Sequence, residues 1–529
     1  MSLRPALALA ALALLPAGVA FGAAPPAPVA PVPANPPIPA NQAAPGGGTP
    51  TEQTFARFGR VVLHHPAGSP SQVVLLATGD DPADPVIATL VRETTARGAL
   101  VVEFDTRAYL AAAGAAKDPC TYVAADLEAL SQRLQKQLAL PTYRPPILIG
   151  YSSGATLVYA ALAEGPPNTF HGAISLALCA GLDIAKPLCK GHGLTVTPGL
   201  PSGKAGFTFG PTSKLEQPWI VLQGADDQVC APAPASDLVH RVPRGAIEIL
   251  PAVGHGFAVE ARWLPRFRAA WATLTAPRPG MTPPAAVADL PLIEVPVASR
   301  PPAAPPGTAT PVIPTPTREA QATFAVILSG DGGWAGLDKE LAGALSERGI
   351  PTVGWNTLSY FWTARTPEGM ANDLARVLRH YQAAWRRDRI LLIGYSFGAD
   401  VLPFMAGRLP ADLSSRVAGV ALLGPSRETG FEFHVSNWLG ALAGGGDDQH
   451  EVLPEVRTLA TKLPGIPLLC MYGEKETDTI CPEIRPPLGK TIAFSGAHHF
   501  GGNYGDVADR LIAEFAPRPA AAPRDQAPK

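Results

Sequence analysis

Two short stretches decide the fold of this chain: Gly150-Tyr151-Ser152-Ser153-Gly154-Ala155 and Gly394-Tyr395-Ser396-Phe397-Gly398-Ala399. Each has the pattern G-x-S-x-G, follows a run of Ile and Leu, and precedes an Ala/Leu-rich segment that can form a helix. A serine in a sharp turn between a strand and a helix, with small neighbours on both sides, is typical of a nucleophile elbow. The sequence therefore predicts two nucleophile elbows, at Ser152 and Ser396.

The surroundings of the two serines repeat in the same order. Three pairs of segments correspond: Thr78-Gly79-Asp80 with Ser329-Gly330-Asp331, the Asp-x-x-Cys pattern of Asp227 and Cys230 with that of Asp478 and Cys481, and Gly254-His255-Gly256-Phe257 with Ala497-His498-His499-Phe500. The offset within these pairs stays between 243 and 251 residues, far above the period of a solenoid. The chain therefore contains a duplicated domain.

Composition divides the 529 residues into folded and spacer segments. Pro and Ala dominate residues 24–50, 277–316 and 517–529, and such stretches favour extended spacers over packed cores. The expected divisions are a signal peptide (1–20), a linker (21–54), a first domain (55–275), a second linker (276–320), a second domain (321–516) and a tail (517–529). The net charge of −2 provides no basic surface for nucleic acid.

The first twenty residues read as a secretory signal peptide. Arg4 precedes an Ala/Leu-rich run that ends in the small-x-small pattern Gly18-Val19-Ala20. A transmembrane anchor is the alternative, but the apolar run is short for a bilayer. No cysteine lies there to carry a lipid, and no later run of 18 residues is apolar throughout. We therefore expect a soluble mature protein in the periplasm.

The six cysteines divide evenly between the repeats. Four lie in the first (Cys120, Cys179, Cys189 and Cys230) and two in the second (Cys470 and Cys481). Even numbers behind a signal peptide predict disulfides within each domain. Cys470–Cys481 is then fixed, whereas the first repeat allows three connectivities, of which we favour Cys179–Cys189 with Cys120–Cys230. A zinc site lacks a Cys-x-x-Cys pair, so no metal or other cofactor is expected.

Short runs of apolar residues alternate with amphipathic segments along each repeat. The runs are Val73–Ala77, Leu100–Phe104, Ile147–Ile149, Ala173–Leu178 and Trp219–Gln223 in the first, and Phe324–Leu328, Thr352–Trp355, Ile390–Ile393, Val420–Leu423 and Pro467–Tyr472 in the second. Continuous apolar runs separated by helices indicate buried parallel strands. The expected fold class is α/β, with two tandem α/β-hydrolase-like domains, each a mostly parallel sheet flanked by helices.

A serine hydroxyl becomes a strong nucleophile only when an imidazole accepts its proton and a carboxylate orients that imidazole. In the second repeat the candidates are Ser396, Asp478 and His498, with His499 as the alternative base. Asp478 follows the run that ends at Tyr472, and His498 follows the apolar run Thr491–Phe494. The order Ser, Asp, His along the chain is that of α/β-hydrolases.

The first repeat offers the same three residues in the same order. Ser152, Asp227 and His255 are the candidates, with Asp226 as the alternative acid. A lone Asp in a glycine-rich loop usually caps its own backbone. The joint occurrence of Ser, Asp and His in two repeats favours catalysis at both sites.

An oxyanion hole requires two backbone N–H groups, one of them from the residue after the nucleophile. Ser153 and Phe397 occupy that position. In the second repeat the glycine-rich loop containing Asp331 and Gly332 is suited to supply the other group. The matching loop of the first repeat has Pro82, which lacks an N–H, so the first oxyanion hole is expected to be weaker.

Four motifs of the second repeat resemble the bacterial virulence protein family VirJ. They are Ser329-Gly330-Asp331-Gly332-Gly333-Trp334, Tyr360-Phe361-Trp362, Arg365-Thr366-Pro367-Glu368 and the long string from Gly394 to Pro403. The resemblance covers about residues 322–515, and the longer AcvB members share the order of signal peptide, amino-terminal region and VirJ domain.

The resemblance implies a periplasmic hydrolase that removes the lysyl or alanyl group from aminoacylated phosphatidylglycerol. It also implies virulence and a link to type IV secretion. The residues alone indicate a secreted serine esterase, so a general esterase, thioesterase or peptidase stays open, as does a non-catalytic component of a secretion complex.

Two features of the second repeat have alternative interpretations. The aromatic cluster Tyr360-Phe361-Trp362 either lines an acyl or lipid pocket or packs in the core, and core packing is the commoner role of such residues. Asp331 and Asp400 either hold the ammonium group of a substrate or cap a loop and a helix.

Overall fold

The computed structural model describes residues 49–276 except 202, 284–297, 317–433, and 449–515 except 503. The predicted signal peptide and tail, and most of both predicted linkers, lie outside these residues. The two repeats belong to one compact unit of the chain. Within the described residues, no helix has the length and apolar character needed to cross a bilayer.

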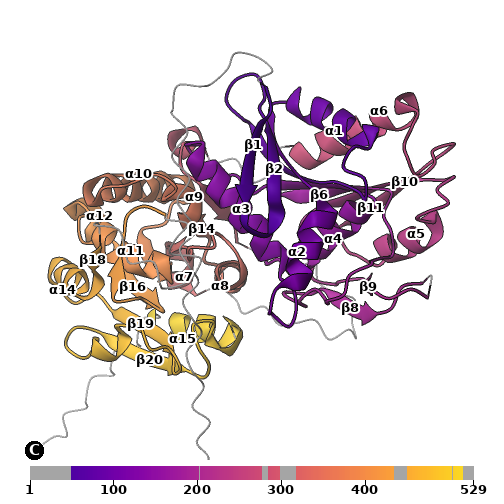
Figure 1. The fold of residues 1–529 in the computed structure, drawn as a ribbon. Helices are drawn as coiled ribbons and strands as arrows, with labels where there is room; N and C mark the ends of the chain where they lie inside the picture. The colour runs from indigo at the N-terminus through magenta and orange to yellow at the C-terminus, as the bar shows by residue number, and fades with distance from the viewer. Residues whose placement is uncertain are drawn as a thin grey trace, which may run out of the picture. The chain divides into compact units, whose positions relative to one another are not determined.

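The first repeat is built around an eight-stranded sheet (Figure 1). In sheet order, the strands are β1 (Thr51–Phe55), β2 (Gly59–His64), β4 (Ala99–Phe104), β3 (Gln72–Ala77), β5 (Ile147–Tyr151), β6 (Gly172–Leu176), β10 (Trp219–Gly224) and β11 (Gly245–Leu250). The strands from β4 to β11 pair in parallel, whereas β1 and β2 form an antiparallel edge.

The second repeat has a seven-stranded sheet with the same arrangement of its six parallel strands. In sheet order, the strands are β12 (Leu292–Val295), β14 (Thr352–Trp355), β13 (Thr323–Leu328), β15 (Arg389–Tyr395), β16 (Val417–Leu423), β19 (Leu468–Gly473) and β20 (Lys490–Phe494). Only β12 runs antiparallel to its neighbour. The expected fold class and all ten predicted strands are confirmed.

Helices cover both faces of each sheet, which explains why the strands are apolar throughout. In the first repeat, α2 (Thr106–Ala115), α3 (Val123–Gln137), α4 (Ser153–Glu164) and α5 (Pro232–His240) share one core, and α1 (Pro85–Thr95) and α6 (Glu260–Thr275) share the other. Neighbouring residues of one strand, such as Leu75 and Leu76, belong to opposite cores because side chains alternate along a strand.

The second repeat follows the same plan. One core contains α10 (Pro367–Trp385), α11 (Phe397–Ala406) and α14 (Val452–Lys462), and the other contains α8 (Gly336–Glu347) and α15 (Tyr504–Phe515). Three helices are short: α7 (Arg318–Ala322), α9 (Thr357–Tyr360) and α12 (Ala411–Ser414).

Some ordered elements lie where the sequence predicted linkers or no strand. β1 includes residues of the first predicted linker, and β12 with the short 3-10 helix Ala285–Val287 lies inside the second. The strands β2 and β11 and two small sheets were also not predicted. One small sheet consists of β7 (Gly181–Leu182), β8 (Thr195–Pro198) and β9 (Phe207–Gly210), and the other of β17 (Glu428–Thr429) and β18 (His450–Glu451). Short edge strands lack the apolar runs that mark the buried ones.

All six cysteines form disulfides, in the pairs Cys120–Cys189, Cys179–Cys230 and Cys470–Cys481. The pair within the second repeat is as expected, but the favoured pairing Cys179–Cys189 is wrong. The Cys189 N–H donates to the Thr121 carbonyl at 2.9 Å and the Thr121 N–H donates to the Pro187 carbonyl at 3.0 Å, which brings Cys120 beside Cys189. Cys179 follows β6, which pairs with β10, so it lies beside the loop of Cys230.

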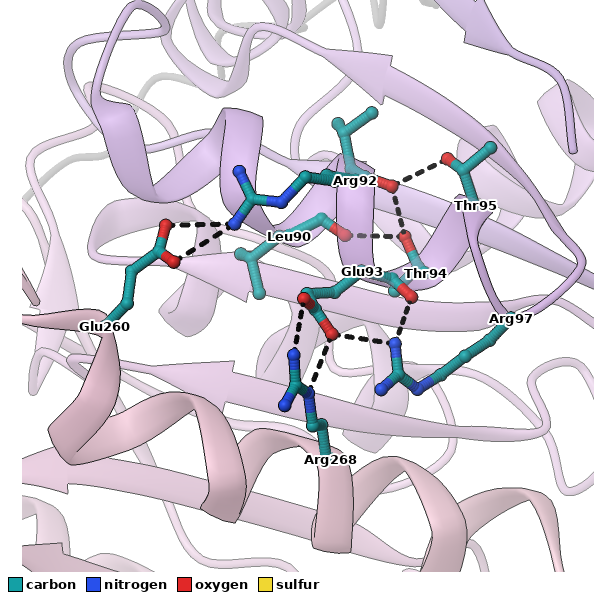
Figure 2. Close-up of polar contacts among 9 residues, drawn as sticks. Leu90, Arg92, Glu93, Thr94, Thr95, Arg97, Glu260 and Arg268 are labelled. Atoms are coloured by element: carbon teal, nitrogen blue, oxygen red, sulfur yellow. Dashed lines mark hydrogen bonds and ion pairs between the residues drawn. The ribbon is translucent and has the colours of Figure 1, made fainter. Parts of the chain in front are cut away.

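Ion pairs join α1 to α6 in the first repeat (Figure 2). The carboxylate of Glu93 accepts hydrogen bonds from Arg268 at 2.9 and 3.0 Å and from Arg97 at 2.8 Å. Arg92, next to Glu93 in α1, donates to both oxygens of Glu260 at the start of α6. The bonds from Arg268 and Arg97 lower the pKa of Glu93. These contacts hold α6 in place directly after the loop that carries His255.

Candidate active site

Both predicted nucleophiles lie where the sheet order reverses. The chain passes from β3 to β4 on one side and then crosses to β5 on the other, and the second repeat does the same around β13. In doubly wound sheets this reversal leaves a crevice at the carboxyl ends of the strands, where ligands bind. Ser152 follows β5 and Ser396 follows β15, so each serine lies at the carboxyl end of a strand beside this reversal.

The backbone of both serines has the strained conformation of a nucleophile elbow. Ser152 has φ 56° and ψ −119°, and Ser396 has φ 53° and ψ −125°. These angles are unfavourable for residues other than glycine and turn the hydroxyl away from strand and helix. A Cβ on Gly154 would lie 2.3 Å from the carbonyl oxygens of Ala77 and Thr78 at the end of β3, and one on Gly398 would lie 2.3 Å from the Leu328 oxygen at the end of β13. The glycines therefore permit the close approach of helix and strand.

The structure brings Ser152, His255 and Asp227 together in the first repeat. The Ser152 hydroxyl lies 3.1 Å from Nε2 of His255, and Nδ1 of the same ring lies 3.0 Å from the Asp227 carboxylate. Asp227 is buried and also accepts the N–H groups of Val229 and Cys230. Asp226, the alternative acid, is exposed.

A similar chain of contacts forms in the second repeat. The Ser396 hydroxyl lies 2.8 Å from Nε2 of His498, and Nδ1 of His498 lies 3.1 Å from Oε2 of Glu476. The other oxygen of Glu476 accepts the Gly473 N–H at 2.7 Å, which holds the carboxylate at the end of β19. Ser396, His498 and Glu476 thus have the geometry of a hydrolase triad.

The acid beside His498 differs from the predicted one, Asp478. Asp478 is exposed two residues further along the loop, whereas Glu476 is half-buried against the imidazole. The glycine that ends the strand before each acid loop is a better guide to the position of the acid. Asp227 is the third residue after Gly224, and Glu476 is the third residue after Gly473. Matching Cys230 with Cys481 pairs Asp227 with Asp478 instead of Glu476, because the second loop has two more residues between its acid and its cysteine.

His499, the alternative base, contacts Tyr395, whereas His498 is the imidazole beside Ser396. Its Nδ1 lies 2.9 Å from the Tyr395 hydroxyl, and the Tyr395 ring stacks on His498 with 5.4 Å between centroids. Burial lowers the pKa of His499, and the neighbouring His498 lowers it further. His499 therefore supports the Tyr395 side chain, on which the His498 ring rests.

The loops predicted to complete the oxyanion holes lie against the serines. A Cβ on Gly330 would be 3.3 Å from Cβ of Ser396, and one on Gly79 would be 3.3 Å from Cβ of Ser152. Asp331 and Gly332 are exposed at the mouth of the second site. Ser153 and Phe397 begin the helices after the nucleophiles, so their N–H groups are among those at a helix amino terminus, which favours a negative charge.

Asp400 has a structural role. Its Oδ1 accepts the Ser426 N–H at 2.6 Å and so joins α11 to the loop after β16. Burial raises the pKa of Asp400 well above its ordinary value, and the charges of Asp331 and Asp478 raise it further. A buried carboxyl with a raised pKa that is already hydrogen-bonded is a poor partner for an ammonium group.

The aromatic cluster divides between two roles. Tyr360 and Phe361 are buried in the core of the second repeat, where the Tyr360 hydroxyl donates to Asp373 at 2.6 Å. Trp362 instead packs with Tyr143 of the first repeat, and its indole N–H donates to the Leu140 carbonyl at 2.9 Å. Core packing accounts for the first two residues, and contact between the repeats accounts for the third.

Among the described residues, no group of three or more His, Cys, Asp or Glu side chains is placed to hold a metal ion.

One family model matches the chain. Residues 322–518 match the family described as "Bacterial virulence protein (VirJ)". This segment contains β13 to α15, and so Ser396, Glu476 and His498. No curated protein sequence matches the chain.

Solved structures of α/β hydrolases are similar to parts of the chain. An α/β serine hydrolase without a lid from Xanthomonas campestris has 18% identity, covers 43% of this chain and 93% of its own, and has a TM-score of 0.28. The esterase domain of a Rhodothermus marinus protein has 18% identity, with 42% and 97% covered and a TM-score of 0.29. Est1E from Butyrivibrio proteoclasticus has 10% identity, with 44% and 100% covered and a TM-score of 0.32.

Proposed function

We propose that the second repeat is a serine ester hydrolase that removes the lysyl or alanyl group from aminoacylated phosphatidylglycerol. The observation that carries the proposal is the series of contacts from Ser396 to His498 to Glu476, which lies inside the segment that matches the VirJ family. The geometry supports ester hydrolysis, and the family resemblance supports the choice of substrate.

The first half of the reaction forms an acyl-enzyme. Nε2 of His498 accepts the Ser396 proton while the serine oxygen attacks the ester carbonyl, and Glu476 stabilises the imidazolium. The N–H of Phe397 and one from the Asp331–Gly332 loop would bind the oxyanion. His498 then returns its proton to the glycerol oxygen, so phosphatidylglycerol leaves with its hydroxyl restored.

The second half releases the amino acid. Water gives a proton to His498 and attacks the aminoacyl-serine ester, and collapse of the intermediate returns the proton to Ser396. The products are the free amino acid and an unmodified enzyme. No redox step or metal is required, which agrees with a site built from Ser, His and a carboxylate.

We place this reaction in the periplasm. Three disulfides indicate an oxidising compartment, and the VirJ match is consistent with it. The substrate is a membrane lipid, so the protein would act at the outer face of the inner membrane. Contact with type IV secretion components is a further expectation from the resemblance.

The test uses the purified full chain and vesicles of phosphatidylglycerol that contain lysyl-phosphatidylglycerol. We expect release of free lysine by the wild type and by Ser152→Ala, and none by Ser396→Ala. Rapid cleavage of short nitrophenyl esters without lysine release would favour a general esterase. No activity on either ester would favour a binding role in a secretion complex.

The first repeat supports a second hydrolytic site. Ser152, His255 and Asp227 are within hydrogen-bonding distance in the required order, and nothing about packing alone requires these three residues together. The loop after β3 contains Pro82 in place of the paired glycines, so we expect slower turnover at this site.

A further inference from the structure

Two buried hydroxyl groups hold the loop that follows β13. Ser329 is the first residue of this loop, and Thr357 begins the short helix α9 after the neighbouring strand β14. Both side chains are fully buried. The Thr357 N–H donates to the Ser329 hydroxyl oxygen at 3.1 Å, and the two hydroxyl oxygens lie 3.0 Å apart. The Thr357 hydroxyl also lies 2.6 Å from the Gly330 carbonyl oxygen, so this pair of hydroxyls is bonded to the backbone of the loop.

The bonds of the two hydroxyls form one series. Each hydroxyl has a single hydrogen to donate. The shortest contact assigns the Thr357 hydrogen to the Gly330 carbonyl, in preference to the Ser329 carbonyl at 3.0 Å. Ser329 then donates to Thr357, so three bonds follow one another from the Thr357 N–H to the Gly330 carbonyl, and such a series strengthens its members. The same carbonyl accepts the Gly333 N–H at 3.0 Å, and the two bonds together fix its orientation.

The peptide group that these bonds orient lies beside the nucleophile. A Cβ on Gly330 would be 3.3 Å from Cβ of Ser396. The peptide bond between Gly330 and Asp331 is trans, so the Asp331 N–H points opposite to the Gly330 carbonyl and away from Thr357. Within the part of the chain that the structure describes, this N–H has no hydrogen-bond acceptor. It is therefore available to bind an oxygen of the substrate.

The first repeat lacks both supports of this peptide group. Its loop has Pro82 in place of the glycine whose N–H donates to the carbonyl, and proline has no N–H. Thr106 corresponds to Thr357, but its buried Oγ1 has no hydrogen-bond partner among the described residues. Among those residues, the Gly79 carbonyl accepts only the hydroxyl of the adjacent Thr78, at 3.3 Å. The matching peptide group is therefore held less firmly at the first site.

We propose that Thr357 and Ser329 position the Asp331 N–H as the second donor of the oxyanion hole at Ser396. Thr357 is a positioning residue, because it acts through the Gly330 carbonyl and does not contact the substrate. A donor that is already oriented stabilises the oxyanion without reorganisation during the reaction. The role of Thr357 deepens the proposed function and rests on it for Ser396 as the nucleophile.

The test uses the full chain with Ser152→Ala, so that only the second site can hydrolyse a nitrophenyl ester. Thr357→Val keeps the shape of the side chain and removes its hydroxyl. It should lower kcat roughly 10–100-fold with little change in KM, because the oxyanion forms only on the way to the tetrahedral intermediate. Affinity for phenylboronic acid, which forms a tetrahedral adduct with a catalytic serine, should fall by the same factor. Thr357→Ser keeps the hydroxyl and should restore most of the loss.

The matched control is Thr106→Val in the same chain. It makes the same change at the corresponding place of the first repeat, where the hydroxyl has no partner among the described residues. We expect kcat and the affinity for phenylboronic acid to stay unchanged in this control. If Thr357→Val does not fold, Ser329→Ala removes the middle donor of the series and is measured in the same way.

Three results would overturn the role of Thr357. They are an unchanged kcat in folded Thr357→Val, a loss that appears in KM alone, and a loss of kcat that Thr357→Ser shares in full. If the wild type cleaves no ester, the rate at which a fluorophosphonate labels Ser396 replaces kcat, because phosphonylation uses the same oxyanion hole. A wild type in which Ser396 is not labelled would also overturn the proposal.

The outcome is separable from that of the lipid assay. Release of lysine from lysyl-phosphatidylglycerol with no effect of Thr357→Val supports the proposed function and rejects the positioning role. Loss of kcat in Thr357→Val, in a chain that cleaves nitrophenyl esters but leaves the lipid intact, supports the positioning role and rejects the lipid as the substrate.

Discussion

The two repeats share one Ser-His-acid arrangement but use different acids. In the first, Asp227 is buried and accepts two backbone N–H groups besides its bond to His255. In the second, Glu476 reaches His498 with a longer side chain and accepts the Gly473 N–H. The position is the same, three residues after the last glycine of the strand. A duplicated site thus conserves the location of the carboxylate more strictly than the residue type.

The disulfides that restrain the loops of Asp227 and Glu476 also differ between the repeats. Cys179–Cys230 joins the loop of Asp227 to the end of β6, whereas Cys470–Cys481 closes the loop of Glu476 onto its own strand β19. Both bonds restrain the segment that carries the acid. The first anchors that segment to a neighbouring strand, and the second anchors it to the strand that precedes it.

The largest expected effect is the difference in activity between the Ser396→Ala and Ser152→Ala variants. Ser396→Ala should lower hydrolysis of the aminoacyl ester on the order of 10⁴-fold or more, because no other group in the site can form the acyl-enzyme. A fluorophosphonate probe should label Ser396 faster than Ser152, as mass spectrometry of the labelled peptides will report. Activity that survives in Ser396→Ala and disappears in Ser152→Ala would reverse the ranking of the repeats.

The next effect concerns the acid of the second repeat. Glu476→Gln should lower kcat roughly 10²–10⁴-fold, because the imidazole loses the carboxylate that selects its tautomer. Asp478→Asn, two residues away and exposed, serves as the matched control and should retain most activity. The opposite result would restore the acid expected from the sequence.

A smaller effect is expected at His499. Replacing it by Gln removes the bond to Tyr395, so we expect kcat to fall at most roughly fivefold, the equivalent of one hydrogen bond. His498→Gln should abolish turnover under the same conditions. Similar losses in both variants would mean that the two imidazoles share the proton transfer.

The smallest effect concerns stability in the first repeat. Glu93→Gln should lower the free energy of unfolding by about 1–2 kcal/mol, because Arg268 and Arg97 lose their shared carboxylate. The pKa of Glu93 is lowered by folding, so this contribution is present above pH 4.5, its unfolded value, and is lost as the pH falls through the folded pKa. Urea unfolding at pH 7 and pH 3 should therefore differ less in the variant than in the wild type.

Much of the fold was predictable because its signals are local. Buried parallel strands such as β5 and β15 are continuous apolar runs, and the elbow needs glycines at fixed positions beside Ser152 and Ser396. The edge strand β12 was missed because a short strand at a sheet edge needs no apolar run and here lies in a proline-rich stretch. The pairing Cys120–Cys189 was missed because it depends on two loops that meet only in the folded chain.

The sequence was sufficient to predict the duplication, the α/β class, and the serine and histidine that lie within hydrogen-bonding distance of each other in each repeat. These features depend on residue spacing within one segment or on the order of segments along the chain, and the sequence shows both directly. The folded chain was needed to show that Glu476 reaches His498 and that Lys136 of α3 contacts Trp362 and Glu432 of the other repeat. The physical reason is that these contacts join residues whose distances follow from loop length and packing, which leave no periodic signal in the sequence.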